Sequence, residues 1–167
     1  MSKLDLITHL YEYNEWANDH LLDVASRLPA EEIGAGRGAS FGSVLDSLAH
    51  IAAAQINWLE RWLTGSNRTP TLDLQKMPDL GTVRASFLAS HAGLREFVSD
   101  LTDVRIEAPL EFRDSSGRAL SRPLWQLMTH VANHGTYHRG EIAMMLTAAG
   151  HSPGDLDFVF WEFEHHP

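Results

Sequence analysis

Cysteine is absent from the 167 residues of this chain. Its absence excludes disulfide bonds, a cysteine nucleophile and thiolate metal ligands, so any thiol that takes part in chemistry would have to arrive with a substrate. Basic residues are also few: 13 lysines and arginines stand against 22 aspartates and glutamates, which gives a formal net charge of −9. This excess of negative charge argues against binding nucleic acid through its phosphates.

Long apolar runs are missing as well. No stretch of about 18 apolar residues occurs, so we expect no membrane span. The N-terminal Met1–His9 lacks the apolar core of a signal peptide, and we therefore expect a soluble, cytoplasmic protein. Apolar residues make up 44% and charged residues 21% of the chain, an ordinary globular balance. The length suits a single domain over residues 1–167.

Apolar residues recur at helical spacing in four long segments. We predict helices over Lys3–Leu28, Gly42–Thr64, Thr82–Leu101 and Pro123–Gly150. Ser40 or Ser43 is the expected N-terminal cap of the second helix. The tail, Phe158–Phe163, is rich in aromatic residues and is expected to pack back onto the helices.

Two of the connections are long. Residues 65–80 and 102–122 exceed the short loops of an up-down-up-down bundle, so they leave room for crossovers. Within the second connection, Ile106–Phe112, a turn at Asp114–Gly117 and Arg118–Leu120 predict a small β-hairpin. The expected fold class is all-α: a four-helix bundle with long crossover connections and a small β-hairpin between the third and fourth helices.

Three histidines follow one another at intervals of four in the fourth predicted helix: His130, His134 and His138. A helix turns about 100° per residue, so their directions can be compared with that of the apolar stripe. His138 lies in the middle of the stripe, His134 roughly 50° to one side and His130 roughly 90° off, at its edge. His134 and His138 therefore form an inward pair that can bind one divalent ion from successive turns. The alternative is a pair of core histidines that are hydrogen-bonded to their neighbours.

A third metal ligand would have to come from another helix. His91 lies on the apolar stripe of the third predicted helix, beside Leu94 and Val98, whereas His50 lies well away from the main stripe of the second. Periodicity alone therefore favours His91 over His50 as the third ligand.

Three segments together form a more specific pattern: Tyr13–Asn18 in the first helix, Leu48–Ile51 with Trp58-Leu59 in the second, and His130–Glu141 in the fourth. The most specific part is His-x-x-x-His-Arg-Gly at residues 134–140. Over nearly its whole length, the chain resembles the DinB/YfiT-like family of metal-binding four-helix proteins.

The resemblance implies a set of metal ligands. In that family, one histidine of the second helix and two of the fourth form a three-histidine site in the bundle interior. Carried over by motif, these are His50, His134 and His138. The resemblance agrees with the orientation argument for the fourth helix and disagrees with it for the second. We follow it for His50, because the small residues Ala53 and Ala54 on the same face can line a wet cleft, and keep His91 as the alternative.

Three histidines without a fourth protein ligand leave one coordination position open, which is the pattern of a catalytic zinc site. Zinc there would lower the pKa of a bound water to about 7, and a substrate thiol in the same position would lose its proton. An all-imidazole set suits zinc or nickel, and it also suits copper or iron.

The resemblance implies an activity as well as a site. It points to a metal-dependent enzyme acting on a small molecule, either a thiol-dependent S-transferase with a low-molecular-weight thiol as cosubstrate or a hydrolase. The alternative is a non-catalytic, metal-stabilised binding or stress-response module. The resemblance to this family and the aromatic-rich helices also imply a homodimer.

Other polar residues near the motif are weaker candidates. Asn14 and Asn18, on the apolar stripe of the first helix, either orient a substrate or pair with each other or with backbone groups. His130 is either a general base beside the open position or a histidine of the rim. Arg139 points off the stripe, where it either meets an anionic substrate or, as we expect, pairs with a surface carboxylate. Glu141 is expected to accept a hydrogen bond from a ligand imidazole.

Overall fold

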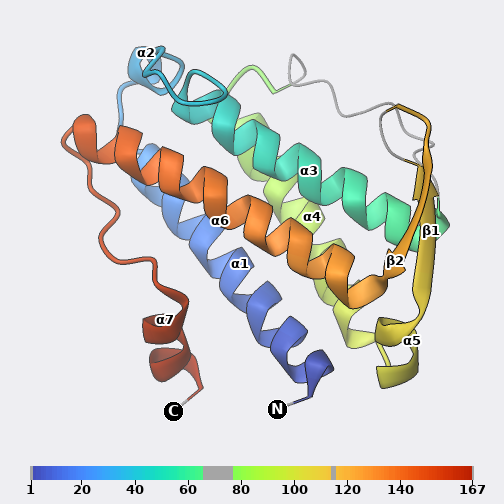
Figure 1. The fold of residues 1–167 in the computed structure, drawn as a ribbon. Coiled ribbons are helices and arrows are strands. Elements are labelled where there is room, and N and C mark those ends of the chain that lie inside the picture. Colours follow the sequence, from blue (N-terminus) through green and yellow to red (C-terminus); the bar gives the residue numbers. More distant parts are fainter. Residues whose placement is uncertain (1, 66–76, 114–115, 167) are drawn as a thin grey trace.

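The structure, a computed structural model, describes residues 2–65, 77–113 and 116–166. Its body consists of four long helices (Figure 1): α1 (Lys3–Ala25), α3 (Val44–Thr64), α4 (Leu80–Ser99) and α6 (Leu124–Ala148). Every boundary of these helices lies within three residues of the predicted one. The prediction of an all-α fold with a small hairpin is therefore confirmed.

Side-chain caps explain where two of these helices begin. Of the two serines considered for α3, Ser43 is the cap, and its hydroxyl accepts a hydrogen bond from the Asp46 N–H at 3.0 Å. Asp79 does the same for α4, accepting from the Thr82 N–H at 2.7 Å. At the other end of α3, Gly65 adopts a left-handed conformation with φ of 70°, which ends the helix at little steric cost.

The long helices form a ring in which α1 and α3 are diagonal to each other. Both α4 and α6 pack against α1 and against α3. Figure 1 shows that α1 and α6 run in the same direction and that α3 and α4 run in the opposite one. Since α3 and α4 are neighbours with the same direction, a short turn cannot join them. The long connection after α3 is thus a consequence of the topology.

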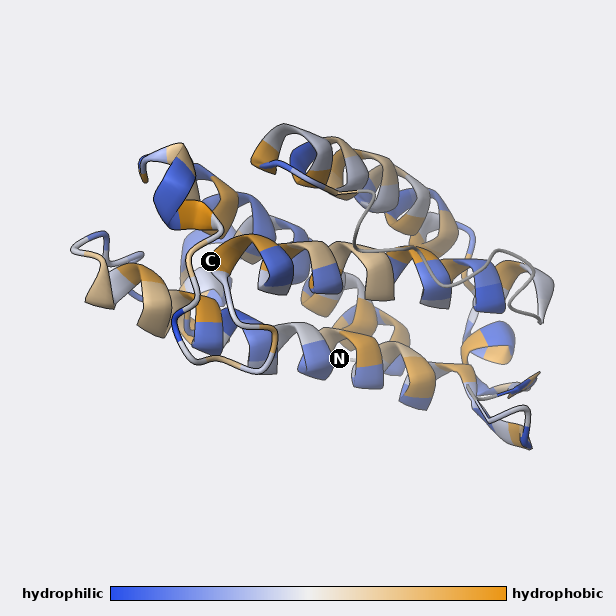
Figure 2. Ribbon diagram, turned by 90° about the horizontal axis from the view of Figure 1, so that it is seen from above, coloured by the Kyte–Doolittle hydropathy of each residue, from blue (hydrophilic) through white to orange (hydrophobic). Residues whose placement is uncertain are grey.

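The core forms where the four apolar stripes meet. One residue from each long helix, Leu21, Leu48, Phe87 and Met145, is at most 1% exposed. Burial of such a side chain stabilises the fold by about 1.5–3 kcal/mol. In Figure 2 each long helix carries hydrophobic and hydrophilic residues along its whole length, as expected for helices with one face in the core.

The hairpin begins later in the chain than predicted. Strands β1 (Pro109–Arg113) and β2 (Ala119–Pro123) pair antiparallel. Residues before β1 form a short helix instead, α5 (Asp103–Glu107), because the Thr102 hydroxyl caps it and Ile106 turns into the core, where it is 1% exposed. Of the predicted turn, residues 114 and 115 lie outside the described part of the chain.

Two further short helices were not predicted. They are α2 (Ala30–Ile33) and α7 (Phe158–His165). The tail packs back onto the bundle as expected: α7 contacts α1, and Trp161 is 4% exposed with its ring 5.8 Å from that of Tyr13. Among the described helices, none combines the length and apolar content needed to cross a membrane.

Candidate metal centre

The fold brings His50, His134 and His138 together, and we call these residues the three-His cluster. His50 comes from α3, and the other two lie on successive turns of the adjacent, oppositely directed α6. Each ring offers one nitrogen, and these three nitrogens lie within 4.8 Å of one another. The Nε2 atoms of His50 and His134 are 3.0 Å apart. Three imidazoles on two helices therefore face one point.

His50 reaches the cluster although it lies off the main apolar stripe of its helix. The side chain sits at the seam between α3 and α6 and is half-buried. Within that seam it lies beside His138, with ring centroids 4.7 Å apart. The periodicity argument that preferred His91 is wrong here, because a second helix covers a face of α3 that periodicity assigns to solvent.

His91 lies elsewhere, in the core between α4 and α1. It is 2% exposed, and its Nε2 is 3.4 Å from the Asn18 amide nitrogen. Its Nδ1 is 3.6 Å from an Asp19 carboxylate oxygen. The nitrogens and carboxylate oxygens of His91, Asp19 and Glu15 form a separate cluster. His91 therefore does not share the point on which His50 and His134 converge.

Two imidazoles of the cluster are held in the neutral form. Burial, and then the neighbouring His138, lower the pKa of His50 from 6.5 to about 4. Burial, followed by the charges of His138, His50 and His130, lowers the pKa of His134 to about 4 as well. At neutral pH both rings therefore carry a lone pair that can bind a metal.

A carboxylate fixes the orientation of the third imidazole. His138 donates from Nδ1 to Glu141 at 2.8 Å, so its Nε2 remains for the cluster. Glu141 also accepts hydrogen bonds from the Ser40 hydroxyl and from the Ser40 N–H. Burial raises the pKa of Glu141, but the hydrogen bonds from Ser40 and His138 outweigh it and lower the pKa overall. The expected role of Glu141 is seen in this contact, whereas sequence reasoning considered Ser40 only as a helix cap.

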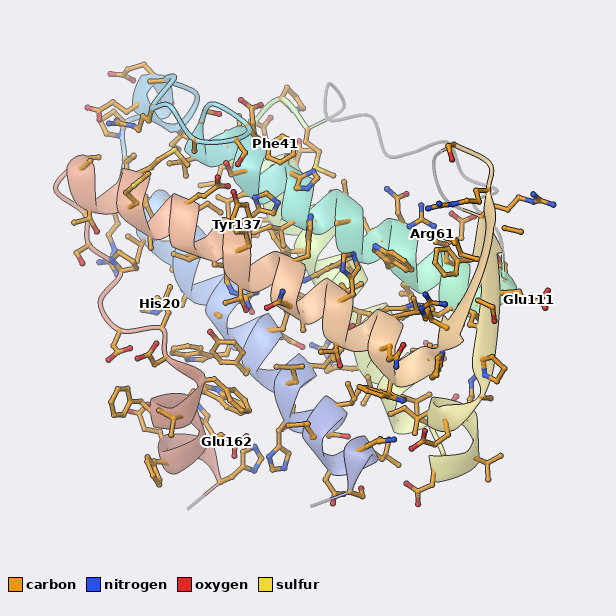
Figure 3. The ribbon with its side chains drawn as sticks, in the orientation of Figure 1. His20, Phe41, Arg61, Glu111, Tyr137 and Glu162 are labelled. Carbon is orange, nitrogen blue, oxygen red and sulfur yellow. The ribbon has the colours of Figure 1, made fainter. Side chains whose placement is uncertain are left out.

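Aromatic side chains flank the three-His cluster. Phe41, in the loop before α3, stacks on His50 with ring centroids 3.8 Å apart and meets His138 edge-on at 5.3 Å. Tyr137 meets His138 edge-on at 4.9 Å and is 62% exposed. Figure 3 shows Phe41 and Tyr137 close to the α3–α6 seam. Sequence reasoning missed Phe41, because a loop residue has no periodicity that reveals its direction.

His130 lies at the rim of the seam, one turn before the cluster. It is exposed, and its ring centroid is 6.1 Å from that of His134 and 5.4 Å from that of Trp58. Arg61 continues this line along α3, with its guanidinium carbon 4.5 Å from the centre of the Trp58 ring. In Figure 3 Arg61 lies toward the hairpin end of α3. A solvent-facing path of aromatic and basic side chains thus leads away from the three-His cluster.

Asn14, Asn18 and Arg139 belong together in the core. The Arg139 guanidinium donates to the side-chain oxygens of Asn14 at 2.7 Å and of Asn18 at 3.0 Å. Arg139 is 2% exposed, so the expectation that it pairs with a surface carboxylate is wrong. The two asparagine amides supply the acceptors that allow this burial.

The residues present fit a divalent metal. Neutral imidazole nitrogens are good ligands for zinc, nickel, copper and iron. In the described residues, the candidate ligand group at this place contains only the three histidines. A fourth position would therefore face the seam, where His50 and His134 are half-buried rather than enclosed. Three imidazoles without a fourth protein ligand are the donor set of a metal site with one coordination position left for another ligand.

Comparisons with known proteins agree with this architecture. The sequence profile of the DinB family matches residues 1–166. Protein DinB of Bacillus subtilis (strain 168) is 28% identical over an alignment of length 171, gaps included, which spans 95% of this chain and 95% of that protein. The crystal structure of a DinB-like protein (YjoA) from Bacillus subtilis superposes with a TM-score of 0.61 at 14% identity, covering 86% of this chain and 92% of the other. That superposition supports the fold, and the profile match covers nearly every residue, so the chain belongs to the DinB family.

Proposed function

We propose that the three-His cluster binds a divalent metal ion, zinc or nickel, and that the chain is a metal-dependent enzyme acting on a small molecule. One observation carries this proposal: three imidazole nitrogens from two helices lie within 4.8 Å of one another. The lowered pKa of His50 and His134 and the hydrogen bond between His138 and Glu141 support it, because each favours the ligand form of an imidazole.

The reaction proposed is a thiol-dependent S-transfer, with hydrolysis as the other chemistry of the same site. A divalent ion held by three imidazoles lowers the pKa of a thiol or a water molecule that reaches it. The chain has no cysteine, so the thiol would be a low-molecular-weight cosubstrate. Arg61, at the end of the path from the cluster, would favour a substrate that carries an anionic group.

The side chains around the three-His cluster would orient a ligand, cover the site and accept a proton. Glu141 holds the His138 ring and fixes its tautomer. Phe41 covers one side of the cluster, where it stacks on His50, meets His138 edge-on and keeps water from these two rings. His130 faces solvent 6.1 Å from His134, where it can accept a proton from an incoming thiol and pass it to bulk water.

A second candidate function is a non-catalytic, metal-stabilised binding or stress-response module. The observation that favours it is the origin of the ligands, since one comes from α3 and two come from α6. An ion bound by all three would link these helices and stabilise the folded state by its binding free energy.

The metal site is tested by elemental analysis of protein purified without added metal. We expect about one equivalent in the natural chain and a loss of metal in His50→Ala, His134→Ala and His138→Ala. The matched control is His130→Ala, which removes a histidine from the same repeat on α6 and should keep its metal. Unchanged metal content in all three cluster variants would show that the ligand assignment is wrong.

The activity is tested separately, with a panel of cellular thiols and a small electrophile, and with an ester as hydrolase substrate. Turnover that a chelator abolishes and that zinc or nickel restores supports the enzyme. Metal that raises the melting temperature without turnover on any pair supports the module instead.

We also propose a homodimer, because α7 leaves Phe160 51% and Phe163 71% exposed. Sedimentation velocity measures the mass of the assembly directly.

A further inference from the structure

A cavity lies on the side of α6 that faces α1 and the segment before α7. Its volume is about 360 Å³. Its lining includes Tyr13, Thr136, Arg139, Asp155, Leu156 and Asp157. Thr136 and Arg139 leave α6 on the face turned away from His134 and His138, since each residue is rotated by about 100° from the last. The cavity is therefore separate from the three-His cluster, and we call it the Arg139 cavity.

Arg139 brings a buried positive charge to this cavity. Its side chain is 2% exposed, and its hydrogen-bond acceptors are the neutral oxygens of Asn14, Asn18 and Thr136. Its Nε, also buried, has no hydrogen-bond partner among the residues that the structure describes. Across the described residues, no carboxylate forms an ion pair with this guanidinium.

Such a charge is unusual in a protein core. Arginine stays protonated even though burial lowers its pKa. Buried charges are normally paired, because an uncompensated one is strongly destabilising. The Tyr13 ring, 5.3 Å from the guanidinium carbon, offsets part of the charge. An anionic group entering the cavity would offset the rest.

The protein itself offers only an indirect counter-charge. Asn18 approaches His91 at 3.4 Å, and His91 approaches Asp19 at 3.6 Å. Asp19 is thus separated from Arg139 by two neutral side chains. It also lies outside the residues that line the Arg139 cavity.

Acidic residues line the same cavity at its solvent side. Asp155 and Asp157 are both exposed, and the Asp157 N–H donates to the Asp155 carboxylate at 2.8 Å. Between them, the Leu156 carbonyl accepts a hydrogen bond from the Tyr13 hydroxyl at 2.6 Å, which holds this segment against α1. The lining of the cavity therefore combines one buried cationic side chain, Arg139, with two exposed carboxylates.

We propose that the Arg139 cavity binds a small zwitterion of the amino acid type, with its carboxylate toward Arg139 and its ammonium group toward Asp155 and Asp157. The two ends of the cavity exclude the simpler ligands. A plain carboxylate would meet repulsion from the aspartates, and a plain amine would meet repulsion from the arginine. Only a molecule with both charges matches both ends.

Isothermal titration of the full chain with L-alanine, propionate and ethylammonium tests this proposal. Alanine combines the two charged groups, each of the other probes carries one of them, and all three are small enough for the cavity. We expect alanine to bind at least tenfold more tightly than either single-charge probe. Equal affinities of alanine and propionate, or no binding of any probe, would overturn the proposal.

Variants locate the binding. The exposed double change Asp155→Asn with Asp157→Asn should weaken alanine at least tenfold while leaving propionate as tight or tighter. Arg139→Gln keeps donors toward the asparagines but removes the charge, and should abolish the alanine signal. Ala143→Phe fills the cavity without removing the Arg139 charge and should do the same. Alanine affinity that survives both the double aspartate change and Ala143→Phe would place binding elsewhere and refute the assignment.

The second site is also separable from the first. His134→Ala, which removes a residue of the three-His cluster, should leave alanine affinity within twofold of the natural chain. A large loss of alanine affinity in this variant would mean that the probe binds at the three-His cluster, and the proposal would then fail.

Discussion

His50 and His134 should contribute little to any fall in the metal affinity of the three-His cluster between pH 7 and pH 5.5. A metal ion binds neutral imidazole, so protons compete with it only near the pKa of the ligand. That pKa is about 4 for both His50 and His134, with burial as the main cause. Because both values lie below the ordinary one, the pH range in which protons displace the metal from these two ligands moves down toward pH 4.

The size of the effect follows from these values. An imidazole with the ordinary pKa of about 6.5 loses about eightfold in metal affinity between pH 7 and pH 5.5, and two such ligands lose about 70-fold. With the pKa values of His50 and His134 at about 4, the two together lower the affinity by only about 6% over the same interval.

The measurement is a competition between the protein and a zinc chelator, repeated at half-unit steps from pH 7 to pH 5.5 with the chelator's own protonation accounted for. His130→Ala is the control, because this residue belongs to the same histidine repeat but has its ring 6.1 Å from that of His134. Its curve should follow that of the natural chain. A fall of 70-fold or more in the natural chain would refute the argument, since His50 and His134 would then titrate like exposed histidines.

Three further predictions follow from single contacts. Glu141→Gln should keep the fold but weaken zinc binding about 10–100-fold in the same chelator assay, because the His138 ring loses its charged acceptor. In metal-free protein, His91 should make the fold acid-sensitive. Burial lowers the pKa of His91 from 6.5 to about 4 in the folded state. Between pH 6.5 and pH 4 this histidine is therefore protonated in the unfolded chain but not in the folded one, so the free energy of unfolding falls as the pH drops through that range. At pH 5 the loss is about 2 kcal/mol, and urea unfolding of His91→Gln should show a pH dependence smaller by that amount; identical pH dependence would contradict it. Gly135→Ala should destabilise the fold by about 1–3 kcal/mol, because the new Cβ would lie 2.9 Å from Arg139 Nη1. Gly140→Ala, on the same helix, is the control, because its Cβ meets nothing within 4 Å. In thermal unfolding this control should be neutral or stabilising.

Sequence periodicity predicted the histidines of α6 well and failed for α3, and the reason is physical. His134 and His138 lie on or beside the one apolar stripe of α6, so their direction follows from a single helix. His50 lies at a seam that exists only because α6 covers that face of α3. A pattern within one helix cannot show which neighbour covers its flank. The motif resemblance supplied what the pattern could not.

The residues around the three-His cluster also show that a local sequence pattern does not predict contacts from other segments. Glu141 is three residues after His138 on one helix, so its contact was predictable from helical spacing. Ser40 and Phe41 reach the site from a loop about 100 residues away in the sequence. Their roles depend on how the loop before α3 lies across α6, and no local pattern encodes that arrangement.

Arg139 was misplaced because a charged residue off the stripe was assumed to face water. The signal that it does not was present in α1, where Asn14 and Asn18 stand one turn apart on an apolar stripe. Two buried amides need partners, and a guanidinium, which only donates, satisfies both oxygens.

Arg139 and His138 are adjacent on α6, and this adjacency connects the core to the metal ligands. Hydrogen bonds from Arg139 to α1 restrict rotation of α6 about its own axis. Any rotation of α6 that broke these bonds would also turn His138 away from His50. The directions in which the Arg139 and His138 side chains leave α6 differ by a fixed angle of about 100°. The arginine of the His-x-x-x-His-Arg-Gly segment thus acts on the side of the helix opposite α3: by anchoring α6 to α1, it holds the histidine before it toward the seam.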